Sequence, residues 1–456
     1  MRISYIFAII IVSAIAIPCF AQDINDPRME SERLSWSLNL GTMFLDSQED
    51  DSDILSIALA TDFSMSDWAL GIQLPIFLKT SNFGFPNRAY DEFSDFIQFL
   101  KYMRFGYKGK TEVYFRIGTL FGETAKIGHG SIISDYYSDI DFDSPQKGLQ
   151  FDWDFGRWGF ESILNSVTER NLLGTRFYLR PLNKSRQEEY REISIGISFV
   201  TDNNAPKLMR KDTEGNILYD SSGNLQFESE IINFIAFDLE IPLINKNSVK
   251  ISPYFDYIMM HNYGNGFHLG IHNKFNIPIF GDILPIDLIF EYRNHKSKFM
   301  PVYFDSFYEI ERYNYPLTIS PSTKLAFVPS TKASDGFYSS FKWGIKELFW
   351  IRGSFSLYNN DPQQLKSSLC FEAATEAYFE LNLLYAQRQI QQFNDILELA
   401  EKSIVLLNVS LPVKIGSGSL LIGFMYKRSW RLNSETSTYS PVDIYMPYIS
   451  YRMNFD

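Results

Sequence analysis

Hydrophobic and polar residues alternate along most of this chain, and the alternation is clearest in residues 148–165. Every second position there is apolar, with one interruption at Gly156-Arg157: Leu149, Phe151, Trp153, Phe155, Trp158 and Phe160. Side chains on a β-strand point to opposite faces with a period of two. The stretch is therefore predicted to be a β-hairpin with one aromatic face and one charged face.

The same pattern recurs from Leu34 to Phe455 and predicts about 20 strands in up-and-down order. Residues 373–392 lack Gly and Pro and also fit a helix, but the alternation over 369–375 favours two strands there. The predicted strands are residues 34–46, 54–64, 68–79, 97–107, 112–121, the two arms of the hairpin above, 172–180, 191–200, 231–241, 249–260, 267–277, 284–293, 336–345, 348–358, 369–375, 378–389, 403–413, 419–430 and 442–455.

The amino terminus has the pattern of an export signal. Arg2 precedes an apolar run over residues 6–17, and the small residues Cys19 and Ala21 fit a cleavage site before Gln22. The run is shorter than the roughly 20 residues that a membrane-spanning helix needs, which disfavours a membrane anchor. We therefore predict a cleaved signal peptide, residues 1–21, followed by a single β-barrel domain, residues 22–456.

Composition identifies the solvent on each side of the strands. Aromatic residues make up 16% of the chain, yet the mean hydropathy is only −0.14, as expected when only half of each strand faces lipid. Cys370 alone remains after signal cleavage, so an intramolecular disulfide is excluded. The net charge of −12 argues against nucleic-acid binding. The predicted fold class is all-β, a transmembrane antiparallel up-and-down β-barrel of about 16–20 strands that contacts membrane lipid.

The connections and the last strand point to the bacterial outer membrane. Several short turns alternate with long connections, the pattern of short periplasmic turns and longer outer loops. In the last strand Ile449, Tyr451, Met453 and Phe455 share one face. This strand resembles the assembly signature of bacterial outer-membrane β-barrels, although Asp456 follows the terminal aromatic residue. The whole architecture is similar to that of porins, without a motif of a particular porin family.

The resemblance implies export to the cell outer membrane, insertion by the barrel assembly machinery, and a channel function. A barrel this wide has a lumen that side chains of the wall do not fill. We predict passive diffusion of small hydrophilic solutes. Two alternatives stay open: a non-conducting surface barrel used for adhesion or scaffolding, with its lumen blocked by loops, and a barrel lipid hydrolase. The oligomeric state is left open.

Charged residues on the inward faces of neighbouring strands are candidate pore-lining residues. They form a basic, an acidic and a second basic group along the chain. Opposed charges across a constriction would orient dipolar solutes, whereas adjacent charges would simply form salt bridges in the wall. The candidates are Arg104, Arg116, Asp152, Asp154, Glu161, Arg176 and Arg180.

The long connection over residues 122–147 has two interpretations: a loop folded into the lumen as a constriction, or a solvated outer loop. Its candidate constriction residues are His129, Asp135, Asp139, Asp141 and Asp143.

Evidence for catalysis or metal binding in the sequence is weak. His129 and Ser131 lack a nucleophile elbow and an orienting third group, so no enzymatic activity is predicted. His268 and His272 share one face of a strand but lie about 13 Å apart at ~3.3 Å per residue. That separation is too large for one metal ion, so we predict neither a metal site nor a cofactor.

Overall fold

The computed structural model describes residues 34–46, 54–65, 67–79, 99–142, 145–182, 193–219, 225–279, 282–315, 322–345, 349–359, 367–375, 379–390, 395, 403–433 and 437–455. The predicted signal peptide lies outside these residues, and so does Asp143. The described strands are all antiparallel neighbours in one sheet: β1 (Leu34–Asp46), β2 (Ile54–Met65), β3 (Trp68–Lys79), β4 (Leu100–Phe105), β5 (Val113–Gly118), β6 (Gly148–Asp154), β7 (Trp158–Leu164), β8 (Leu172–Leu179), β9 (Ser194–Met209), β10 (Phe227–Glu240), β11 (Ile244–Lys246), β12 (Val249–Met260), β13 (Asn265–Ile279), β14 (Asp282–His295), β15 (Ser334–Ile345), β16 (Phe349–Tyr358), β17 (Ser367–Thr375), β18 (Glu380–Arg388), β19 (Ser403–Ile415), β20 (Gly418–Asn433) and β21 (Thr438–Phe455).

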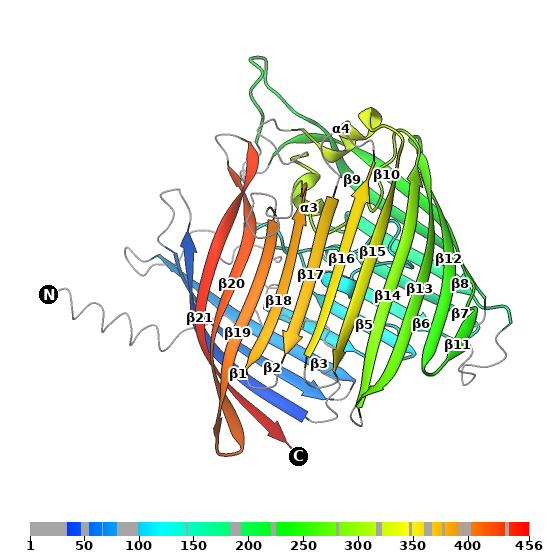
Figure 1. Ribbon diagram of the computed structural model, residues 1–456. Coiled ribbons are helices and arrows are strands. Elements are labelled where there is room, and N and C mark those ends of the chain that lie inside the picture. The colour runs from blue at the N-terminus through cyan, green and yellow to red at the C-terminus, as the bar shows by residue number, and fades with distance from the viewer. Residues whose placement is uncertain are drawn as a thin grey trace.

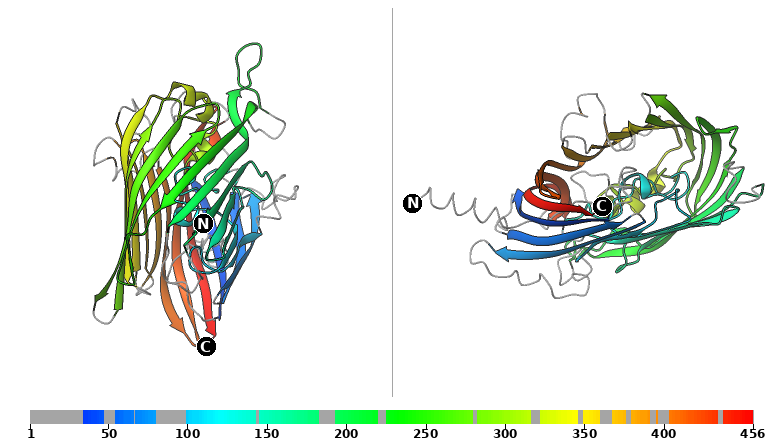
Figure 2. Two further views of the ribbon diagram at one scale, coloured as in Figure 1. Left: turned by 90° about the vertical axis from the view of Figure 1, so that its right-hand side faces the viewer. Right: turned by 90° about the horizontal axis from the view of Figure 1, so that it is seen from below.

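The sheet closes on itself to form a barrel (Figure 1 and Figure 2). β1 pairs with β21 from Leu34–Phe455 to Asp46–Asp443, so the first and last strands are neighbours. The short β11 continues the line of β10, and both pair with β12. Closure leaves no sheet edge exposed to hydrocarbon, where an unpaired backbone group costs several kcal/mol.

The two faces of the wall differ in the way the alternation predicts. Along β8 and the first part of β9, up to Val200, buried residues alternate with exposed or half-buried ones, and the exposed ones there are large and apolar. Similar outward residues follow around the barrel: Phe177, Leu179, Ile195, Ile197, Phe199, Phe237, Leu269, Phe290, Phe337 and Phe341. An apolar belt outside and polar side chains inside define a transmembrane β-barrel and confirm the predicted fold class.

Several predicted strand boundaries differ from the observed ones, and the largest error concerns β9. The sequence predicts that a strand ends at Val200 and that Asp202-Asn203-Asn204 form a turn, but β9 continues to Met209. Asp202 is fully buried and contacts Arg312, with 3.3 Å between Oδ2 and Nη2. Polar residues on the inner face of a filled barrel thus resemble turn residues in sequence. The helix alternative for residues 373–392 is also excluded, because β17 and β18 occupy 367–375 and 380–388.

Two connections from the same rim fold into the barrel. The described part of the first covers residues 119–142 and 145–147. The described part of the second covers residues 296–315 and 322–333 and carries α3 (Tyr308–Glu311) and α4 (Lys324–Phe327). We name them the first and second inserted segments. Their backbones meet in a parallel bridge between Ile133 and Phe304. The helices found among the described residues are all too short to cross a bilayer.

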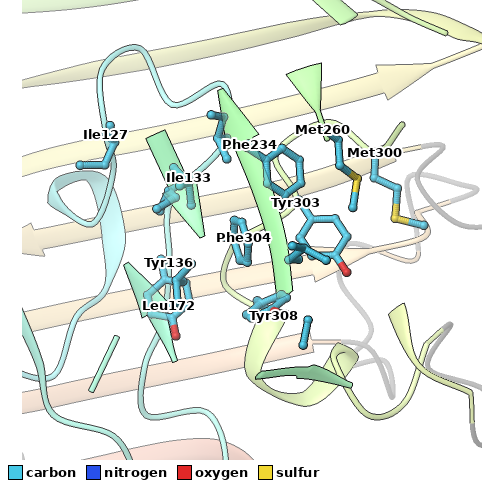
Figure 3. Close-up of a cluster of buried hydrophobic side chains, with 14 of the residues drawn as sticks. Ile127, Ile133, Tyr136, Leu172, Phe234, Met260, Met300, Tyr303, Phe304 and Tyr308 are labelled. Atoms are coloured by element: carbon cyan, nitrogen blue, oxygen red, sulfur yellow. The ribbon is translucent and has the colours of Figure 1, made fainter. Parts of the chain in front are cut away.

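The inserted segments pack against the inner wall through hydrophobic side chains. One buried cluster joins Ile133 and Tyr136 of the first segment to Phe304 and Tyr308 of the second, and to Phe234 of β10 (Figure 3). A second cluster joins Ile140 and Ile310 to residues of β16–β21, including Trp430. The first segment also bonds to the edge of β20, since Phe142 N–H donates to the Trp430 carbonyl at 2.7 Å. The upper part of the barrel therefore holds a packed core.

Candidate functional site

The seven predicted pore-lining residues all lie on the inner face of the wall, on β4–β8 or directly after β8. Arg104 and Arg116 are cross-strand partners on β4 and β5. The guanidinium of Arg104 donates to the Gly106 carbonyl at 2.8 Å and lies over the Tyr107 ring. Arg116 donates to the Thr119 carbonyl at 3.3 Å. The two guanidinium groups can lie side by side because each donates to its own backbone carbonyl.

The acidic candidates form short ion pairs with neighbouring cations. Asp152 pairs with Lys108 at 3.0 Å, and Asp154 pairs with Arg180 at 2.9 Å.

Glu161, the cross-strand partner of Asp152, pairs with Arg176 at 2.7 Å. Arg176 also binds Asp238 of β10 at 2.6 Å, so the network continues across β9. The structure therefore brings the three predicted acids together with Lys108, Arg176 and Arg180 in short ion pairs, whereas Arg104 and Arg116 donate to backbone carbonyls.

A cavity of about 710 Å³ lies against this network. Its lining includes the turn over residues 107–112, which places it near the rim of short turns, the lower rim in Figure 1. The described lining includes the three predicted acids but not the four predicted arginines. Both signs of charge face it: Lys108, Lys126, Lys274, Lys342, Glu123, Asp152, Asp154, Glu161 and Asp287.

The first inserted segment is held at several points of the inner wall. His129 Nδ1 lies 2.8 Å from an Asp256 carboxylate oxygen on β12, and its ring stacks on Tyr254. The other candidate constriction residues contact β16, β20 and β21 respectively: Asp135 with Arg352 at 2.7 Å, Asp139 with Lys427 at 3.1 Å, and Asp141 with the Tyr439 hydroxyl at 2.9 Å. The connection over residues 122–147 was predicted to be either a loop folded into the lumen or a solvated outer loop. In the structure its described residues lie inside the barrel.

Glu123 anchors the lower end of the same segment. Its carboxylate forms an ion pair of 2.6 Å with Lys342 of β15. Burial alone would raise the pKa of Glu123. The positive charges of Lys342 and Arg352 lower the pKa by more than burial raises it, so the net pKa lies well below the usual value. The carboxylate is therefore ionised and faces the large cavity.

The second inserted segment was not recognised as a lumen element from the sequence. Buried Arg312 contacts Asp202 and Glu309, and Lys324 binds Glu311 at 2.8 Å. The sequence does contain a feature that indicates burial of this segment: residues 299–315 have more aromatic and apolar side chains than a solvated loop would carry. Those side chains now form much of the first buried cluster.

A second, smaller cavity of about 90 Å³ separates the inserted segments from β14–β18. Asp135 and Arg293 line it, together with the hydroxyls of Ser354, Ser356 and Ser368. On β16, Trp350 lines the large cavity and Ser354 lines the small one. Arg352 lies between them in sequence and on the same face, so its ion pair with Asp135 stands between the two cavities.

A closed antiparallel barrel with an apolar belt, a polar interior and loops folded into its lumen is an outer-membrane β-barrel of porin-like architecture. No protein-family model matches the sequence, and a comparison with curated proteins finds no match either.

Comparison with solved structures finds outer-membrane barrels at low similarity. OccK11 of Pseudomonas aeruginosa has 10% sequence identity and a TM-score of 0.34, over 93% of this chain and 96% of that one. Wzi of Escherichia coli, described as a carbohydrate-binding β-barrel involved in group 1 capsule assembly, has 11% identity and a TM-score of 0.35, over 95% of this chain and 87% of that one. OccAB4 of Acinetobacter baumannii has 10% identity and a TM-score of 0.30, over 94% and 100%. The class assigned to this chain rests on the geometry of its own barrel.

Proposed function

We propose that this protein is a channel of the cell outer membrane through which small hydrophilic solutes diffuse passively. The observation that carries the proposal is the cavity of about 710 Å³ inside the barrel, lined by charges of both signs. Charged groups and water in such a cavity replace the hydration shell of a polar solute. The inserted segments narrow the passage, which favours small solutes.

The route that we propose follows the inner faces of β15 and β16. It leads from the large cavity past the Arg352–Asp135 ion pair to the small cavity with its serine hydroxyls. Side-chain movement of Arg352 away from Asp135 would join the two cavities. This route avoids the first buried hydrophobic cluster, whereas Trp350, Phe307, Cys370 and Ala386 of the second cluster form part of its wall.

A second candidate function is a non-conducting surface barrel used for adhesion or scaffolding. The packed clusters beneath the upper rim favour it, because they fill much of the lumen. Single-channel recording in planar bilayers distinguishes the two. Discrete conductance steps support the channel, whereas a folded, heat-modifiable protein that gives no steps supports the blocked barrel.

Replacing Asp152 and Asp154 together by Asn is expected to raise the ratio of anion to cation permeability. The change leaves Lys108 and Arg180 without their carboxylate partners, so the cavity wall becomes more positive by two charges. The shift in reversal potential in a salt gradient should shrink at high salt, because the Debye length falls from about 10 Å at 0.1 M to about 3 Å at 1 M.

Asp443→Asn is the matched control. Asp443 pairs with Arg428 at 2.7 Å and lies on the same face as exposed Tyr445, outside the lumen, so its loss should leave the reversal potential unchanged. If instead the double variant keeps the wild-type reversal potential and loses only thermal stability, the acids are wall salt bridges without a role in selectivity.

A further inference from the structure

Three ionisable side chains converge on the inner face of β12, β13 and β14. Asp256 and His268 are direct cross-strand partners, and Glu291 is on the next strand. Their ligand atoms all lie within 4.8 Å of one another. All three are buried: the exposed fractions are 1% for Asp256, 0% for His268 and 4% for Glu291.

Two atoms in this cluster have no hydrogen-bond partner in the structure: Asp256 Oδ2 and His268 Nδ1. His268 Nδ1 lies 3.3 Å from a Glu291 carboxylate oxygen without forming a hydrogen bond. A buried polar atom left unpaired destabilises the folded protein. Two unpaired buried atoms in one cluster, beside a second carboxylate, indicate that something else belongs between these side chains.

The neighbouring imidazole supports the same conclusion. His268 Nε2 lies 3.0 Å from His295 Nε2, so one of the two nitrogens carries the shared proton. If His268 donates it, His268 Nδ1 bears a lone pair that faces the carboxylates. Metal-bound histidines donate their other ring N–H to an outer partner, which fixes the tautomer. His295 is placed to be that partner.

We propose that Asp256, His268 and Glu291 form a binding site for one divalent transition-metal ion, with His295 as the outer partner of His268. Imidazole and carboxylate are both zinc ligands, and zinc stands high in the affinity order of first-row metals. Ligand atoms around one zinc lie roughly 3.4 Å apart at bond lengths near 2.1 Å, so small side-chain rotations complete the site. Water takes the fourth position.

The surrounding charges allow a divalent ion. His129 contacts Asp256, and Arg293 contacts Glu291. When His129 is protonated, these two positive charges balance the negative charges of the two carboxylates. Around them lie three further carboxylates, Asp238, Glu240 and Glu161, and the cations Arg176 and Lys108. Zinc would join three strands and, through His129, the first inserted segment.

The test uses the full mature protein folded in detergent, with any affinity tag removed and metal stripped by a chelator. We expect one Zn²⁺ per chain by calorimetry and one Co²⁺ per chain with a visible d–d absorption band. His268→Gln and Asp256→Asn should each raise the Kd by at least about 100-fold, and His295→Gln by about 10–100-fold, the range known for outer partners.

His272→Gln is the matched control. His272 is on the same strand and the same inner face, but it binds Asp287 at 2.6 Å and lies outside the cluster. Its loss should leave the Kd unchanged. The proposal is overturned if the wild type binds no zinc, if His268→Gln and Asp256→Asn bind it as tightly as the wild type, or if His272→Gln loses it equally. Binding is measured without conduction, so the result is independent of the proposed channel function.

Discussion

Removing the second inserted segment is expected to raise the single-channel conductance several-fold. The backbone allows the removal, because Lys298 N–H donates to the Thr331 carbonyl at 3.0 Å and the two ends of the segment therefore meet. A short Gly-Ser linker can replace residues 299–330. Without the aromatic residues between Phe299 and Tyr315, a barrel of this strand number is too wide for wall side chains to fill, and ions cross through water.

A matched control uses another connection on the same rim. The β9–β10 connection has an exposed turn at Asp212–Asn216, far from the lumen, and it projects above the barrel in Figure 1. Replacing that turn by Asn-Gly should leave the conductance unchanged.

Deleting the second inserted segment also removes Arg312, the ion-pair partner of Asp202. Water then solvates the Asp202 carboxylate, which limits the loss of stability. Equal conductance of a folded deletion variant and the wild type would show that the segment does not limit flow.

The fold of this chain is largely predictable because lipid and the backbone leave few solutions. Period-two alternation located 68–79 and 249–260, the full extents of β3 and β12. In hydrocarbon a sheet must close, so the pairing of β1 with β21 follows from physics although no local pattern encodes it.

The contents of the lumen were less predictable. Inward residues were expected to face water, yet Gln150 is 1% exposed because its amide donates to the Thr124 carbonyl of the first inserted segment at 2.6 Å. An inner face covered by protein and one covered by water have the same polar pattern in sequence. Only the aromatic content of the second segment distinguished it from a solvated loop.

The cluster around His268 was missed for a related reason. The sequence places His268 and His272 on one face, and distance excludes that pair as a metal site. The partners of His268 are instead Asp256, Glu291 and His295 on the adjacent strands. Cross-strand register decides which side chains meet, and a shift of one residue would have sent all of them to the other face.

Introducing Arg at Phe341 is expected to destabilise the barrel by roughly 2–4 kcal/mol if this site lies near the bilayer midplane. Phe341 is an outward residue of β15 with 42% of its surface exposed, and a charge there has no water or counter-ion to face.

The Phe341 ring also packs over Gly353 of β16, so Phe341→Ala is needed to measure the loss of packing alone. Ser340→Arg, one residue away on the inner face, should cost much less, because Lys342 on the same face lines the water-accessible large cavity. The free energies come from reversible urea unfolding in lipid vesicles. Equal losses for Phe341→Arg and Ser340→Arg, or for Phe341→Arg and Phe341→Ala, would contradict a lipid-facing position for Phe341 and with it the assignment of this face of β15.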